Sequence, residues 1–188
     1  MQVHSVNTAC VEQFVATDGQ TVTSAIRKRP RTGPVAVKPL GLEGDEQADL
    51  TVHGGLAKAV YAYPQEHYAV WQTMRAQAKV NLPLQPGDFG ENLTLTGLLE
   101  TQLWIGDVLR FPDCELVVSE PRYPCFKFNA HMGFNQAAKL MAQSGYCGVY
   151  LAVKREGSIA AGQTFELVPG PREVGIVELF KAKMKAKA

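Results

Sequence analysis

Residues 115–128 read Glu115-Leu-Val-Val-Ser-Glu-Pro-Arg-Tyr-Pro-Cys-Phe-Lys-Phe128, and this stretch indicates how the chain folds. Its first half is a run of branched and apolar residues, which favours a β-strand, and two prolines then end that run. Similar runs, bounded by Gly, Pro or Asp, recur at close spacing in residues 3–16, 90–96, 108–111, 148–154 and 164–168. The sequence therefore predicts a protein built mainly from short strands.

Helices are expected in fewer places. Residues 64–79 and 134–143 have helical periodicity, and a weaker helix is expected from Ile176 toward the C-terminus. In the first of these segments, Pro64 suits the first turn, and Tyr68, Trp71 and Arg75 fall on one side. Because strands and helices do not alternate regularly, we expect a mainly β fold with a few helices, and a barrel is favoured.

The composition is that of an ordinary globular protein. The 188 residues are 46% hydrophobic and 20% charged, and a chain of this length is expected to form one domain. The formal net charge of +1 gives no reason to expect a nucleic-acid polymer as a partner. Lysines alternate with other residues in 181–188, which we interpret as a short, basic, solvated tail.

The sequence predicts a cytoplasmic protein without membrane contact. Residues 1–18 lack the basic start and apolar centre of a signal peptide, and no run approaches the roughly 20 apolar residues that cross a bilayer. The four cysteines are widely separated and form no C-x-x-C pair. In the cytoplasm they are expected to be reduced thiols.

One cysteine is distinguished by its neighbours. Cys125 lies between Arg122 and Lys127, and nearby positive charge lowers the pKa of a thiol. The resulting thiolate is the form that acts as a nucleophile, sulfur carrier or soft-metal ligand. A lone cysteine can instead be a small buried apolar residue. That interpretation is the one we expect for the other three: Cys10, Cys114 and Cys147.

A second candidate cluster surrounds His53. It combines Gly44-Asp-Glu-Gln-Ala-Asp49 with His53-Gly-Gly55 and Lys58. The paired glycines would let the backbone approach a bound group, and Lys58 would offer a cation. His53 and Asp49 could instead simply close a turn. The remaining histidines lack the spacing of a zinc site: His4 in a strand, His67 on the first helix and His131 in a loop.

Two further segments carry polar side chains. Arg27-Lys-Arg-Pro-Arg31 holds four cations in five positions, which indicates either a solvated loop or a grip for an anion. Pro86-Gly-Asp-Phe-Gly-Glu-Asn92 is a glycine-rich turn that leads into a strand and does not fit a P-loop. Its last two residues, Glu91 and Asn92, are candidates for holding the shape of a site.

These pieces, in this order, resemble the MOSC family, the domain found at the C-terminus of molybdenum-cofactor sulfurases. The likeness is to its small bacterial members related to the 6-N-hydroxylaminopurine-resistance protein, and Pro121-Arg-Tyr-Pro-Cys125 with Lys127 is similar to the family signature. The matching stretches span nearly the whole chain. The others are Ser24-Ala-Ile-Arg-Lys28 with Gly33-Pro-Val35, Gly44 to Asp49 with His53-Gly-Gly55 and Lys58-Ala-Val-Tyr61, Glu66-His-Tyr68, Pro86 to Thr94, Ile105-Gly-Asp107 and Gly148-Val-Tyr-Leu151.

The resemblance implies a single MOSC domain over residues 1–188, with a core at about residues 20–170 and a β-barrel like the barrel domain of pyruvate kinase. It also implies that Cys125 is the reactive residue, which either carries a sulfane sulfur or ligates molybdenum. Cationic side chains would then bind the phosphate of the molybdenum cofactor. The candidate catalytic residues are Cys125, His53 and Asp49, the candidate metal ligand is Cys125, and the candidate cofactor-binding residues are Lys28, Lys58, Arg122, Lys127, Glu91 and Asn92.

The resemblance favours one function and leaves others open. The leading hypothesis is a molybdenum-cofactor-dependent enzyme that reduces N-hydroxylated bases or similar small molecules. Because the chain has no redox motif of its own, a separate flavin or iron–sulfur reductase would supply electrons. The alternative is a persulfide carrier served by a sulfur donor, or a cofactor-binding module without a redox cycle. A metal-free thiol hydrolase would need Cys125 beside His53 and Asp49.

The sequence also departs from the family pattern. Ser24-Ala25 replaces the usual threonine-glycine, and Gly162-Gln163 replaces the usual glycine-aspartate. The chain stops soon after Phe180, where longer relatives continue into a small helical domain, so we expect no substrate or reductase contact from such a domain. The pyridoxal-phosphate lyase domain of full sulfurases is absent, and lysine aldimine chemistry is not expected. A homodimer is compatible with the sequence.

Overall fold

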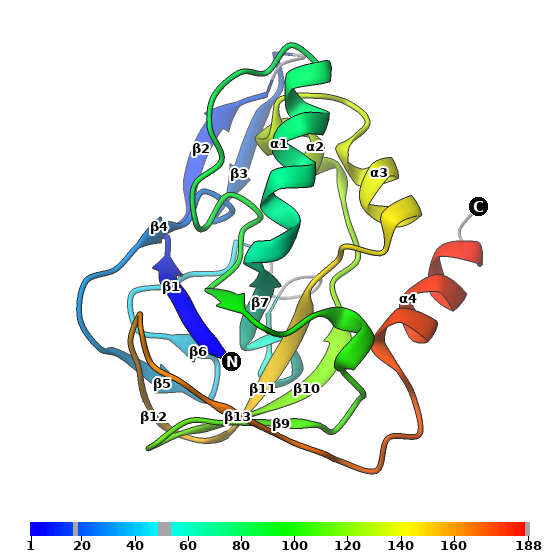
Figure 1. Cartoon of the computed structure of the whole chain (residues 1–188). Coiled ribbons are helices and arrows are strands. Elements are labelled where there is room, and N and C mark those ends of the chain that lie inside the picture. Colours follow the sequence, from blue (N-terminus) through cyan, green and yellow to red (C-terminus); the bar gives the residue numbers. More distant parts are fainter. Residues whose placement is uncertain (17–18, 49–53, 187–188) are drawn as a thin grey trace.

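A computed structural model describes residues 1–16, 19–48 and 54–186, and within them the fold is mainly β (Figure 1). The largest sheet has eight strands, which are antiparallel except for the parallel pair β7 and β8. Its spatial order is β13 (Glu166–Val168), β9 (Val108–Arg110), β10 (Glu115–Pro121), β11 (Val149–Arg155), β7 (Val60–Pro64), β8 (Leu93–Thr96), β1 (Gln2–Thr8) and β4 (Arg29–Pro30). Pro30 lies in the edge strand, where its missing N–H leaves no sheet bond unmade.

Two smaller sheets flank the large one. One has the order β12 (Gly157–Ile159), β5 (Val35–Lys38) and β6 (Gly41–Leu42), and the other pairs β2 (Glu12–Val15) with β3 (Thr21–Ser24). The β2 and β3 hairpin lies beside the helices at one end of the molecule (Figure 1).

The large sheet curves until its two ends approach each other. Gln2 forms an isolated bridge with Thr164, just before β13, and the Val3 amide donates to the Gln163 carbonyl over 2.9 Å. The strand order nevertheless has edges at β13 and β4. The expected mainly β fold is confirmed, whereas the expected barrel is a curved open sheet in the described residues, and backbone hydrogen bonds between residues 1–3 and 162–165 join its ends.

The helices occupy two places. The first three, α1 (Tyr68–Gln77), α2 (Phe126–Met132) and α3 (Ala137–Ser144), gather at one end, and α4 (Ile176–Lys185) lies apart from them beside β10 (Figure 1). Short 3₁₀ turns are η1 (Leu56–Lys58), η2 (Gln65–His67) and η3 (Glu100–Gln102). None of the described helices has the length and apolar character that a bilayer-spanning segment needs.

An aromatic core holds the helical end to the sheet. Phe89 stacks on Tyr63 with ring centroids 4.1 Å apart, and Trp71 meets both Phe89 and Phe128 edge-on at 5.6 Å. The Trp71 indole donates to the Tyr63 hydroxyl over 2.7 Å, so its polar atom is satisfied in the interior. These contacts fix α1 and α2 against β7.

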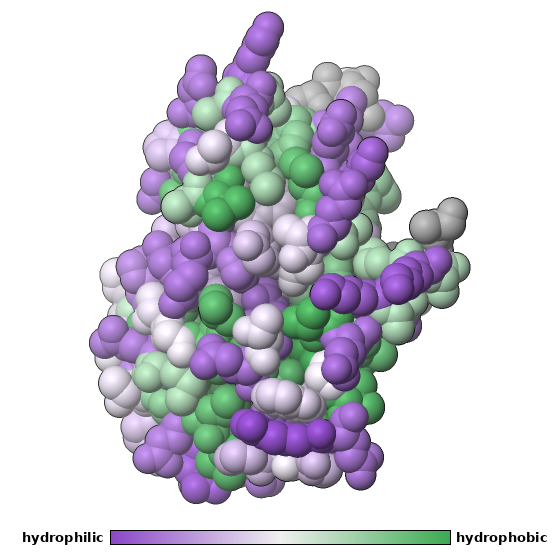
Figure 2. Space-filling view, turned by 45° about the vertical axis from the view of Figure 1, so that its right-hand side comes forward, coloured by the Kyte–Doolittle hydropathy of each residue, from purple (hydrophilic) through white to green (hydrophobic). Residues whose placement is uncertain are grey.

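Most predicted elements are present, but their first and last residues differ from the prediction. Tyr68, Trp71 and Arg75 are buried on one side of α1, as predicted, but Pro64 ends β7 instead of opening the helix. Segment 3–16 is broken between β1 and β2, and the helix predicted at 134–143 is α3. The third predicted helix is α4, and it includes the lysines assigned to a tail. This tail is helical as far as Lys185, and lysines 181, 183 and 185 are solvated, as predicted. Hydrophilic side chains project on the side of the molecule that carries α4 (Figure 2).

The helix α2 was not predicted. Prolines 121 and 124 indicate a loop, and the chain does run irregularly between them, but the helix starts directly after Cys125 and ends at Gly133, whose φ is 81°. His131 therefore lies on this helix and not in a loop. The strands β5 and β7 also escaped prediction, because each is too short or too close to a helical pattern to be recognised alone.

Candidate functional site

Six of the predicted site residues line one cavity of about 100 Å³ between the large sheet and the start of α2. They come from segments far apart in the sequence, and the curvature of the sheet brings them together. They are Lys28, Lys58, Asn92, Arg122, Cys125 and Lys127. Tyr61, Phe89 and Tyr150 add an aromatic wall that the prediction missed, although the stretches resembling the family include all three.

Cys125 has a different environment from the other cysteines. It is half-buried at the cavity, and its carbonyl accepts a bond of 3.0 Å from the Phe128 amide at the start of α2. Cys114 and Cys147 are buried, as predicted, and burial raises the pKa of Cys114 to about 12 and that of Cys147 well above its usual value. Cys10 was also predicted in the core but is exposed, because the break between β1 and β2 carries it outward.

Arg122 supplies a buried positive charge at the cavity. The residue is only 4% exposed, and its guanidinium carbon lies 4.6 Å from the Phe128 ring centroid and 5.6 Å from that of Tyr61. Nη1 also meets the Met141 sulfur at 3.2 Å. In the described part of the chain no carboxylate forms an ion pair with it. A desolvated cation held by aromatic faces is a strong attractor for an anion.

Lys28 is largely neutralised by a partner that the sequence did not single out. Its ammonium forms a buried ion pair with Asp45, and this carboxylate also accepts bonds from the Ala9 amide at 2.9 Å and from Asn92 Nδ2 at 2.8 Å. Burial lowers the pKa of Lys28, and Asp45 opposes that effect. The pair therefore builds the cavity wall more than it offers a free charge.

The remaining two cations lie nearer the solvent. Lys58 Nζ is 3.7 Å from Glu120 Oε1 and 5.8 Å from the ring centroid of Tyr150. Lys127 donates to the Thr23 carbonyl over 3.1 Å.

Asn92 and Glu91 have separate roles. Asn92 lines the cavity and ties it together, since its Oδ1 accepts from the Tyr61 amide at 3.0 Å. Glu91 is fully buried away from the cavity, where it accepts from the Gly87 amide at 2.8 Å, the Phe89 amide at 3.0 Å and the Tyr68 hydroxyl. Burial raises the pKa of Glu91. Its carboxylate holds the turn, as expected of a residue that shapes the site, and does not line the cavity, so its contact to a cofactor stays a prediction.

The other predicted residues fall elsewhere. His53 and Asp49 lie outside the described residues. His67 is buried, with Nε2 2.8 Å from Glu100 Oε2 and its ring stacked on Tyr146, so it holds structure. His4 is an exposed strand residue, as predicted.

Comparison with known proteins identifies the fold and the family together. The sequence model described as the MOSC domain matches residues 49–166, which is more than half of the chain. The chain belongs to the MOSC family. This MOSC protein is 40% identical to the uncharacterized protein YflK of Bacillus subtilis over 156 residues, covering 83% of the chain and 68% of YflK. It is 39% identical to the protein YiiM of Escherichia coli over 155 residues, covering 82% and 68%.

Solved structures and a fungal protein extend this comparison. The MOSC chain superposes on YiiM from Geobacillus stearothermophilus with a TM-score of 0.77 at 30% identity, covering 99% of the chain and 85% of that structure. YiiM from Escherichia coli gives 0.68 at 31% identity, covering 90% and 75%. A Gibberella moniliformis protein called "Reductase" is 37% identical over 155 residues, which cover 81% of the MOSC chain but only 27% of that protein.

Proposed function

We propose that this protein binds the molybdenum cofactor in the cavity beside Cys125 and reduces N-hydroxylated bases or similar small molecules. The observation that carries the proposal is the placement of a half-buried thiol in one cavity with four cationic side chains. A reductase named among the relatives supports reduction as the reaction class.

The residues present fit such a group by their chemistry. A thiolate is a soft ligand that molybdenum accepts, and Cys125 is the cysteine that lines the cavity. Arg122 and Lys58 would hold the phosphate, since fixed cations form strong charge-assisted bonds with it. A volume of about 100 Å³ is smaller than the 300 to 1,000 Å³ of pockets that enclose whole ligands, so the cavity would enclose only part of the cofactor.

The chain's own residues would do three things in the reaction. Cys125 would hold the metal end, the cations would orient the phosphate end, and the aromatic wall of Tyr61, Phe89 and Tyr150 would limit water near the substrate. When bound, the cofactor would supply the two-electron redox chemistry. Electrons would come from a separate reductase, since this sequence carries no redox motif of its own.

The test is metal and pterin analysis of protein purified from a host that makes the cofactor. Wild-type protein is expected to contain both. Lys58→Ala removes a charge-assisted contact of about 1.5 kcal/mol, which corresponds to roughly tenfold weaker binding, so its molybdenum content should fall. The matched control is Lys154→Ala, which removes an exposed lysine outside the cavity.

Cys125→Ser separates reduction from cofactor retention. A hydroxyl is a hard, protonated group, so the variant should lose reduction of a hydroxylamino base while keeping part of its pterin. Wild-type protein without molybdenum but with an extra sulfur on Cys125, detected by mass spectrometry, would show a sulfur carrier instead. Unchanged metal content in Lys58→Ala together with unchanged activity in Cys125→Ser would overturn the proposal.

A further inference from the structure

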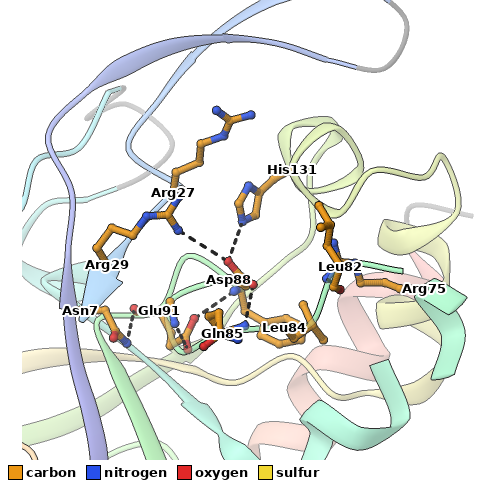
Figure 3. Close-up of polar contacts among 12 residues, drawn as sticks. Asn7, Arg27, Arg29, Arg75, Leu82, Leu84, Gln85, Asp88, Glu91 and His131 are labelled. Atoms are coloured by element: carbon orange, nitrogen blue, oxygen red, sulfur yellow. Dashed lines mark hydrogen bonds and ion pairs between the residues drawn. The ribbon is translucent and has the colours of Figure 1, made fainter. Parts of the chain in front are cut away.

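A second cavity of about 310 Å³ lies on the other side of the segment that carries Lys28. Arg27 reaches it from the segment between β3 and β4, Arg29 from β4, Arg75 from α1 and His131 from α2 (Figure 3). Asp88 is the one acidic side chain among its described lining residues. The family resemblance and the proposed function give no role to any of these five.

The arginines of this cavity are only partly satisfied. Arg29 Nη1 lies 4.0 Å from Asp88 Oδ1, a loose pair, and Arg27 Nε lies 3.8 Å from Glu12 Oε1 at the solvent side. Arg75 donates from Nη1 to the Leu82 carbonyl over 3.0 Å. Its residue is 7% exposed, yet its buried Nε has no hydrogen-bond partner among the described residues. A buried guanidinium with a bond unmade is a costly arrangement that a bound anion would relieve.

The two other polar residues leave the cavity positive. Asp88 Oδ2 accepts from the Gln85 amide at 2.8 Å, and His131 Nε2 lies 3.9 Å from Asp88 Oδ1 (Figure 3). Burial, and then the charges of Arg27, Arg29 and Arg75, lower the pKa of His131 to about 4, so it is neutral near pH 7. Three arginines and one carboxylate then give 3 − 1 = +2, or +1 if the outer Glu12 is included.

We propose that the second cavity binds a small molecule through a phosphate group. A phosphate carries about −1.5 to −2 charges near pH 7, which matches the surplus charge of the cavity. Arginine forks suit phosphate oxygens because they donate two parallel bonds. Leu82, Leu84 and Met132 line the rest of the cavity and would contact an apolar body attached to the phosphate.

The two cavities are separate but share a wall. Lys28 points into the first cavity, whereas its neighbours Arg27 and Arg29 line the second, as alternate side chains of an extended segment do. On the facing turn, Asp88 likewise lines the second cavity and Phe89 lines the first. Binding of a phosphate in the second cavity therefore does not depend on whether the first binds molybdenum cofactor.

The test is isothermal titration calorimetry with phenyl phosphate and with inorganic phosphate, at pH 7.5 and constant ionic strength. Wild-type protein is expected to show saturable binding of phenyl phosphate, tighter than that of inorganic phosphate because of the apolar lining. Arg27→Gln/Arg29→Gln should weaken it about tenfold or more. These two positions are partly exposed, so the double variant is expected to fold. Arg75→Lys keeps the positive charge but loses the paired guanidinium donors, and it should weaken binding as well.

Two further variants serve as controls. Lys154→Ala removes an exposed lysine outside both cavities and should bind phenyl phosphate like the wild type. Arg155→Gln removes an exposed arginine outside both cavities, and it should also have no effect. The proposal is overturned if the wild type shows no saturable binding, if Arg27→Gln/Arg29→Gln binds as tightly as the wild type, or if Arg155→Gln or Lys154→Ala weakens binding equally.

Discussion

At the scale of single residues, environment separates four cysteines that the sequence distinguishes only by their neighbours. Burial keeps Cys114 and Cys147 protonated, while Cys10 is exposed and Cys125 is half-buried in a cationic cavity. Exposure alone would make Cys10 the most reactive thiol. Charge favours Cys125, because Arg122 lies close enough for the two groups to interact.

We predict that Cys125 is alkylated before the other three cysteines. Its thiolate is favoured by the adjacent cations, whereas Cys10 has only its exposure. Timed labelling of the folded protein with iodoacetamide, followed by peptide mass spectrometry, gives the order. Arg122→Met should slow Cys125 while leaving Cys10 unchanged. Faster labelling of Cys10 in the wild type, or of either buried cysteine, would contradict the prediction.

His131 should make the protein less stable in mild acid. Above pH 6.5 the His131 imidazole is neutral in both the folded and the unfolded protein. Below pH 6.5 the unfolded chain takes up a proton that the folded protein does not bind until about pH 4. The free energy of unfolding is therefore expected to fall by up to about 3 kcal/mol between these values. Asp88, whose pKa burial raises, acts in the opposite direction at the acid end.

Urea unfolding at several pH values measures this effect. His131→Gln should flatten the change in unfolding free energy between pH 6.5 and 4, because the titrating group is gone. The control is His4→Gln, which alters an exposed strand residue and should keep the wild-type slope. Parallel curves for wild type and His131→Gln would show that His131 is not the group responsible.

At the scale of elements, the turn between Gln85 and Asn92 sets the wall between the cavities. Glu91 closes the turn by accepting bonds from its amides, and Gly87 comes so close to the segment of Lys28 that a Cβ atom would lie 2.6 Å from the Lys28 carbonyl oxygen. The φ angle of Gly87 is also +97°. A side chain is thus excluded twice, by conformation and by space.

Gly87→Ala is expected to destabilise the protein more than a glycine substitution at an open position. The matched control is Gly145→Ala, since Gly145 has a φ of +75° but nothing within 4 Å of its added Cβ. That control should lose about 1–2 kcal/mol from the left-handed conformation alone. Gly87→Ala should lose at least about 1 kcal/mol more, because the Lys28 backbone must move. Equal losses in urea unfolding would contradict this account.

The elements were predictable where a local pattern was strong. Strands β9, β10 and β11 each carry a continuous branched or apolar run, and α1 has a clear buried side. The helix α2 was missed because prolines dominate the sequence before it, and β4 because two residues carry no periodicity. Such elements are fixed by contacts across the fold and not by their own composition.

At the scale of the whole molecule, only the family resemblance could predict that the site residues meet in one cavity. The residues flanking Cys125 indicate a thiol site, but nothing in the sequence pairs Lys28 with Asp45 or leaves Arg122 between two aromatic rings. Glu91 illustrates the limit, since it neighbours Asn92 yet points into the core. Successive side chains of an extended segment point to opposite sides, and tertiary contacts decide which side each one takes.

The bridge between Gln2 and Thr164 has a consequence for the order in which the chain folds. Strand β1 is synthesised before its partners, β8 and residues 162–164, and can complete its pairing only after them. The hairpin of β9 and β10 closes a short loop instead and can form early. Refolding measured by stopped-flow tryptophan fluorescence should therefore take milliseconds to seconds, as for other sheets with distant pairings.

Two buried side chains distinguish the early and late parts of this order. We expect only the contacts of Leu116 to be formed in the transition state, so Val3→Ala in β1 should mainly speed unfolding and Leu116→Ala in β10 should mainly slow refolding. The reverse assignment of the two rate effects would contradict the order. If it holds, β1 leaves the edge of β8 uncovered until late in folding, and this is the interval in which the nascent protein is most exposed to aggregation.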